Sequence, residues 1–147
     1  MRVEGRWHLF RDGALRPVID AAVQTPDGDW QPVLFLLDSG ADRTVFNADF
    51  LSLLELVALP ESETPQLGGV GGKAESIFVR TRLSFVRDDG KQVKVQSSFC
   101  VFTDPHSSDV SVLGRDVTDN FDVIYGFPKR QVTLLASPHS FHIEQAN

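Results

Sequence analysis

Residues 33–40 read Val-Leu-Phe-Leu-Leu-Asp-Ser-Gly, a continuous apolar run followed at once by a polar turn. An uninterrupted apolar run of this kind predicts a strand that is buried on both faces. Because Asp, Ser and Gly all favour turns, the strand predicted over 30–37 should end at Asp38. The chain is therefore expected to present a carboxylate at the end of a core strand.

Short strands with turn signals flank this run on both sides. Upstream, residues 17–23 predict a strand that forms a hairpin with 30–37 through Thr25-Pro26-Asp27-Gly28. Downstream, 76–86 and 91–102 predict a second hairpin around Asp89-Gly90. The remaining predicted elements are strands at 110–113, 122–125 and 131–135, a short helix at 47–59, and a turn leading into a short helix over 114–121. This pattern predicts a mainly β barrel or sandwich.

Length, charge and cysteine content narrow the possible classes of protein. A chain of 147 residues is expected to form one domain. The net charge is −6 and no Lys/Arg cluster is present, so a nucleic-acid partner is not expected. Cys100 is the only cysteine, which excludes an internal disulfide and favours a buried structural thiol. No metal or cofactor is expected, because the four histidines are scattered along the chain.

The N-terminus is polar and no window approaches the roughly 18 apolar residues of a membrane span. We therefore expect a cytoplasmic protein without a membrane segment.

Asp-Ser-Gly alone is a weak signal, because short turn-forming triplets arise often by chance. Its context strengthens it: the apolar run precedes it, a glycine-rich segment, Gly68-Gly69-Val70-Gly71-Gly72, follows it, and Val112-Leu113-Gly114-Arg115-Asp116 comes later. With these three segments in this order, the chain resembles the retropepsins, the single-domain aspartic peptidases of retroviruses and related cellular proteins. The resemblance covers residues 16–135, the expected core of a single domain spanning 1–147.

The resemblance implies a partly open or closed β-barrel with a glycine-rich flap, active as a two-fold homodimer. It implies that Asp38 is the catalytic carboxylate, that Ser39 braces the pair of turns, and that Gly40 lets the substrate backbone approach. It further implies that Asp42 binds peptide main chain and pairs with Arg115. The residues implied to contact substrate are Ala41, Asp42, Gly69, Val70, Gly71 and Gly72.

One carboxylate is not enough for this chemistry. Hydrolysis of a peptide by water needs a base to deprotonate the water and an acid to protonate the carbonyl oxygen. Two Asp38 residues that share a proton across a two-fold axis could fill both roles, as in the aspartic proteases.

The sequence leaves three points open. Asp116 can be a charge favoured by the dipole at a helix start. A possible terminal hairpin of 121–125 with 131–135 extends beyond the minimal retroviral form and leaves the dimer interface undecided; residues 7–10 or 141–143 can form it. The chain is expected to be an aspartic endopeptidase acting on extended polypeptides; the alternative is a non-catalytic peptide-binding or dimerisation module with the same scaffold.

Overall fold

The computed structural model describes residues 1–64, 75–139 and 142–143. The predicted glycine-rich flap, including Gly69, Val70, Gly71 and Gly72, lies outside the described residues, as does Phe141. The strands are β1 (Arg2–Glu4), β2 (Arg6–Leu9), β3 (Leu15–Gln24), β4 (Trp30–Leu37), β5 (Val45–Phe46), β6 (Ser76–Val86), β7 (Gln92–Phe102), β8 (Ser111–Leu113), β9 (Asp122–Gly126) and β10 (Gln131–Leu135). The short helices are η1 (Ala48–Phe50), α1 (Leu51–Leu54), η2 (Glu55–Val57), η3 (Glu61–Glu63), α2 (Arg115–Thr118) and η4 (Phe127–Lys129).

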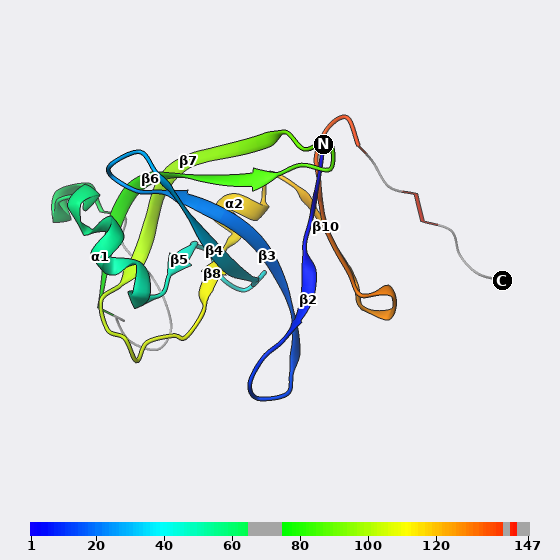
Figure 1. Ribbon diagram of the computed structural model, residues 1–147, viewed down its shortest axis with the longest axis horizontal. Helices are drawn as coiled ribbons and strands as arrows, with labels where there is room; N and C mark the ends of the chain where they lie inside the picture. Colours follow the sequence, from blue (N-terminus) through cyan, green and yellow to red (C-terminus); the bar gives the residue numbers. More distant parts are fainter. Residues whose placement is uncertain (65–74, 140–141, 144–147) are drawn as a thin grey trace.

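Six strands close into a barrel (Figure 1). Their order is β3-β4-β8-β5-β7-β6, and contacts between Ala22–Val23 of β3 and Leu83–Ser84 of β6 complete the ring. β4 and β8 run parallel, whereas the β3–β4 and β6–β7 pairs are antiparallel hairpins. The mainly β barrel and both predicted hairpins are thus confirmed.

The chain ends build a second sheet of order β1-β10-β9. Within it, the predicted terminal hairpin is confirmed, since β9 and β10 pair antiparallel from Asp122↔Leu135 to Gly126↔Gln131. The N-terminal strand β1 then pairs with β10, more than a hundred residues away in sequence. In Figure 1 the loops that join β2 to β3 and β9 to β10 project beyond the barrel.

The barrel is filled by side chains from alternating positions. In β4, Val33, Phe35 and Leu37 are buried in the core, whereas Leu34 and Leu36 face the other side and are only half-buried. Three of the four fully buried phenylalanine rings meet edge-on: Phe46 lies 5.4 Å from Phe35 and 6.1 Å from Phe99 between ring centroids, a favourable aromatic geometry. Cys100 is buried, as expected for a structural thiol.

One predicted helix is corrected and the other is confirmed. Residues 47–59 do not form one helix, but the consecutive short turns η1, α1 and η2. The helical run cannot continue because Ala58 pairs with Val79 of β6 and the Leu59 N–H donates to the Phe78 carbonyl at 2.7 Å. The turn and short helix predicted over 114–121 are confirmed as Gly114 and α2, and the chain re-enters a sheet at Asp122.

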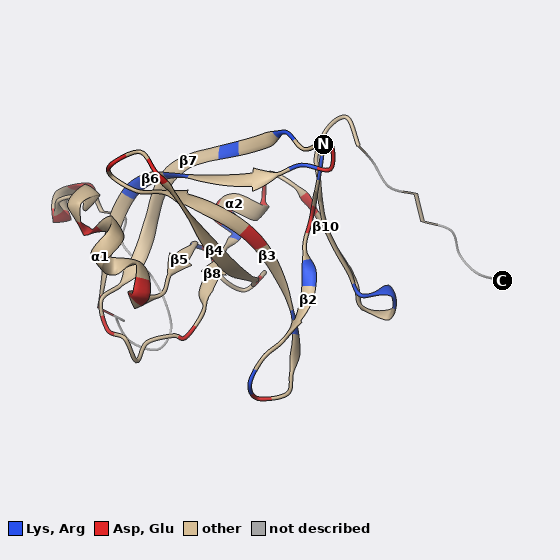
Figure 2. Ribbon diagram, in the orientation of Figure 1, with Lys and Arg blue, Asp and Glu red and all other residues tan. Residues whose placement is uncertain are grey.

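Charged side chains are dispersed over separate strands and loops rather than gathered on one element (Figure 2). Among the described residues, no helix is long and apolar enough to cross a membrane. The same residues contain no group of three or more His, Cys, Asp or Glu side chains that could hold a metal ion.

Candidate active site

Asp38 lies where the core strand β4 ends. Leu37, the preceding residue, is buried and pairs with Leu113 of β8. The Asp38 N–H donates to the Leu113 carbonyl at 3.4 Å, so the parallel pairing extends to the aspartate itself. Asp38, Ser39 and Gly40 are all exposed in the single chain. The barrel therefore holds the backbone while leaving the carboxylate open to solvent.

The turn after Asp38 is closed by its own backbone and side chain. The Gly40 N–H donates to an Asp38 carboxylate oxygen at 2.9 Å, and the Ala41 N–H donates to the Asp38 carbonyl at 3.2 Å. These bonds orient the carboxylate without burying it, since Gly40 adds no side chain above it. The same carboxylate retains free lone pairs for a water or a second carboxyl group.

The start of α2 packs directly against the segment that follows the turn; we call residues 38–44 the Asp38 loop. Arg115 N–H donates to the Ala41 carbonyl at 2.8 Å, and Asp116 N–H donates to the Asp42 carbonyl at 3.2 Å. A Cβ at Gly114 would lie only 2.5 Å from the Arg43 carbonyl oxygen. A glycine is required at 114 because the two backbone segments touch.

Hydrogen bonds between Thr44 and Asp116 hold the far end of the Asp38 loop. Thr44 is fully buried, and both its N–H and its hydroxyl donate to the Asp116 carboxylate, at 2.9 and 2.7 Å. The Gly114 N–H in turn donates to the Thr44 hydroxyl at 3.1 Å. Asp116 is therefore not simply a charge at a helix start, but the acceptor that satisfies a buried threonine.

Sequence reasoning missed this contact because the partners are 72 residues apart. Nothing local distinguishes Thr44 from an ordinary threonine before the short strand β5. The position of Asp116 after Gly114-Arg115 was noticed, but its direction could come only from the tertiary structure.

Arg115 and Asp42 form an ion pair on the surface of the same loop. Their side chains are 51% and 71% exposed, so solvent screens the attraction. The pair lies above the backbone bonds that join α2 to the Asp38 loop. Its main effect is to orient two charged side chains at the rim of the site rather than to stabilise the fold.

One aromatic residue of the terminal sheet, Tyr125, lies near Asp38. Burial, and then the negative charge of Asp38, raise the pKa of Tyr125 in β9. Trp7 of β2 contacts Tyr125 and Phe127 edge-on, with ring centroids 6.5 and 4.9 Å away. Tyr125 and Phe127 remain 43% and 44% exposed. Trp7, Tyr125 and Phe127 thus form an aromatic cluster, and Tyr125 is the member on which the charge of Asp38 acts.

Comparison with known proteins agrees with this arrangement. The profile of a family described as aspartyl protease matches residues 21–117, which include the whole Asp38 loop and the start of α2. No curated protein matches the sequence.

Solved structures give matches of different strength. A retropepsin-like aspartic protease from Rickettsia conorii matches with a TM-score of 0.56 and 18% identity, covering 91% of this chain and 89% of the other. EIAV protease, complexed with the inhibitor HBY-793, matches at 0.43 and 24% identity over 71% and 86% of the two chains. The retroviral protease-like domain of Ddi1 from Leishmania major matches at 0.47 and 15% over 84% and 96%. The fold is therefore retropepsin-like, and the chain belongs to the aspartyl protease family.

Proposed function

We propose that this protein is an aspartic endopeptidase that works as a homodimer and hydrolyses peptide bonds in extended polypeptides. Water is activated between the two Asp38 carboxylates, one acting as base and the other as acid. The observation that carries the proposal is the exposed Asp38 carboxylate at the end of a buried strand, inside the segment that matches the aspartyl protease family.

A second chain is needed because Asp38 is the single Asp-Ser-Gly aspartate in the sequence. When two carboxyl groups lie about 3 Å apart, they cannot both be charged, so they share one proton. In the dimer, Ser39 would hold the two turns together and Gly40 would leave room for the substrate backbone. Ala41 and Asp42, with Gly69, Val70, Gly71 and Gly72, would contact the peptide main chain.

The terminal sheet offers a place for the second chain. Within the part of the chain that the structure describes, β9 pairs only with β10, so its other edge carries unpaired backbone groups. The outer edge of β1, by contrast, is occupied by the Asp88 N–H, which donates to the Arg2 carbonyl at 2.9 Å. An open edge can pair antiparallel with its own copy across a two-fold axis. The charge of Asp38 raises the pKa of Tyr125 in β9, so the two residues lie near each other. Such pairing would therefore bring two Asp38 loops near each other.

Cleavage of a mixed peptide library by the wild type and by Asp38→Asn would test this proposal, at matched concentrations from about pH 4 to 7. We expect cleavage by the wild type alone, with a loss of about 10³-fold or more in Asp38→Asn. Size-exclusion chromatography with light scattering would show that both proteins remain dimers. Equal cleavage by both proteins would assign the activity to a contaminant. No cleavage by a confirmed wild-type dimer would favour a non-catalytic peptide-binding or dimerisation module.

A further inference from the structure

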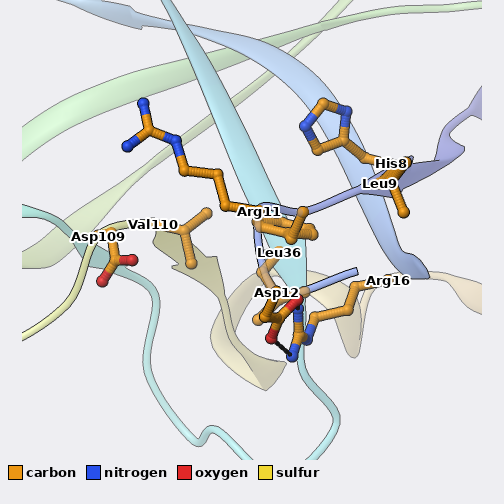
Figure 3. Close-up of a pocket in the computed structure, with 9 residues that line it drawn as sticks. His8, Leu9, Arg11, Asp12, Arg16, Leu36, Asp109 and Val110 are labelled. Carbon is orange, nitrogen blue, oxygen red and sulfur yellow. Dashed lines mark hydrogen bonds and ion pairs between the residues drawn. The ribbon is translucent and has the colours of Figure 1, made fainter. Parts of the chain in front are cut away.

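A groove of about 660 Å³ runs beside the strand end that carries Asp38 (Figure 3). One wall is the hairpin of β2 and β3, which contributes Arg11, Asp12 and Arg16. The other wall is the segment before β8, which contributes Asp109 and Val110. All of these residues belong to the described part of the chain.

The floor of the groove is apolar, and its residue Leu36 belongs to the strand that leads to Asp38. Leu36 lies two residues before Asp38, and side chains two apart in a strand face the same side. Leu36 therefore faces the side of β4 that Asp38 faces, opposite the buried Phe35 and Leu37. Val112 of β8 pairs beside Leu36, and Val110 lies two residues before Val112. A substrate held at Asp38 would thus have an adjacent apolar floor for one of its side chains.

Two of the charges around the groove neutralise each other. Arg16 donates to both carboxylate oxygens of Asp12, at 3.0 and 2.6 Å, and this contact lowers the pKa of Asp12 to about 2. The Arg16 guanidinium also stacks over Phe10, 5.1 Å from the ring centroid. The Asp12–Arg16 pair lines one closed end of the groove. Because its two charges already neutralise each other, the pair attracts another ion only weakly.

Arg11 is different, because it is exposed and forms no ion pair with any described residue. In Figure 3 its side chain points away from the Asp12–Arg16 pair and extends across the groove toward the side where Asp109 lies. The shorter side chain of Asp109 stays at the groove's end. Among the described residues, Arg11 is therefore the positively charged group that lines the groove with Leu36 and Val110 and has no ion-pair partner.

We propose that this groove is a substrate subsite that selects a glutamate-like side chain, with Leu36 and Val110 contacting its methylene groups and Arg11 binding its carboxylate. The planar guanidinium fork suits a carboxylate better than a point charge does, because it can donate two parallel hydrogen bonds. The subsite rests on the proposed peptidase function and adds the chemical class of residue that the substrate carries near the cleaved bond.

Binding of extended decapeptides to the Asp38→Asn protein would test the subsite without requiring cleavage. The peptides carry Leu at the centre and a single Glu, Gln or Lys at each of the other positions in turn, with a fluorescent label for anisotropy. We expect one position at which Glu binds about five- to tenfold more tightly than Gln, as for an exposed charge-assisted contact. The second variant is Asp38→Asn combined with Arg11→Gln, in which this preference should fall to about one.

Arg6→Gln in the same background is the matched control. It removes one positive charge from the same hairpin, but Arg6 pairs with Asp20 rather than lining the groove. The Glu preference should survive Arg6→Gln.

Three results would overturn the subsite: equal binding of Glu and Gln at every position, a Glu preference that survives Arg11→Gln, or a Lys preference abolished by Asp109→Asn. If no peptide bound at all, the subsite would be refuted in the same way. Cleavage by the wild type is scored separately, so a working peptidase without the Glu preference refutes only the subsite. A Glu preference without any cleavage refutes only the peptidase.

Discussion

The Asp38 loop and the edge of β9 differ in how much of their hydrogen bonding is completed inside one chain. In the loop, Thr44 bonds to Asp116, and Arg115 N–H and Asp116 N–H bond to the carbonyls of residues 41 and 42. At β9, only one edge is paired among the described residues. The loop is thus rigid before any partner binds, whereas the edge offers unsatisfied groups to one. A single chain completes the hydrogen bonds of the Asp38 turn, and under the proposed function the open edge of β9 is where a second chain would pair.

Gly114→Ala should have the largest effect, because it disrupts the Asp38 loop. The new Cβ would meet backbone atoms of Arg43 and Ala41, none of which can rotate away. We expect the free energy of unfolding to fall by about 3 kcal/mol or more, as for overpacked sites. Urea unfolding measures this loss, and Gly13→Ala is the control. Gly13 has open space around it, so the cost of Gly13→Ala comes only from the positive φ of Gly13. Equal costs for the two variants would refute the close contact.

Asp116→Ala should have the next largest effect. It leaves the buried N–H and hydroxyl of Thr44 without an acceptor, and we expect a loss of about 2–4 kcal/mol in unfolding free energy. Arg115→Gln, on the neighbouring residue, removes only an exposed ion pair and should cost less than about 1 kcal/mol. If the two variants unfold at the same urea concentration, the buried acceptor is not what holds the loop.

Ile124→Lys would test the open edge. Ile124 is the central residue of β9, so in a two-fold antiparallel pair each Lys would oppose its own copy, and like charges in that position repel. We expect the dimer dissociation constant to rise about tenfold, for a repulsion of about 1 kcal/mol or slightly more. Analytical ultracentrifugation measures it, and activity should return at high protein concentration.

Gln131→Lys places the same charge on an exposed position of β10, which is not the open edge, and should dimerise like the wild type. A dimer of unchanged affinity in Ile124→Lys would place the interface elsewhere.

The smallest expected effect concerns the pKa of Asp12, which pairs with Arg16 at the closed end of the groove. The pKa of Asp12 is lowered from 3.8 to about 2, chiefly by its hydrogen bonds from Arg16. A carboxylate with a depressed folded pKa contributes stability that is present above its unfolded pKa and is lost as the pH falls toward 2. A carbon-13 NMR titration should give an Asp12 midpoint of about 2 in the wild type, moving toward 3.8 in Arg16→Gln. An unchanged midpoint would refute the ion pair.

Local patterns predicted the elements that depend on local contacts. The β3–β4 and β6–β7 hairpins follow from turns such as Asp89-Gly90 between apolar strands, and both formed as expected. The helix predicted over 47–59 failed because Ala58 and Leu59 bond to β6, a contact that no helical pattern contains. β1 was missed because its three residues become a strand only through their pairing with β10.

The sequence by itself determined that an apolar run must end in a turn carrying Asp38, because both the burial and the turn depend on adjacent residues. It also determined that there is one such turn, and hence that a second chain is needed for a carboxylate pair. Only the tertiary structure decided that Asp116 satisfies Thr44, that Gly114 touches Arg43 and that Arg11 lines one groove with Leu36 and Val110. These contacts join segments far apart in the chain, and their geometry exists only once the barrel has closed.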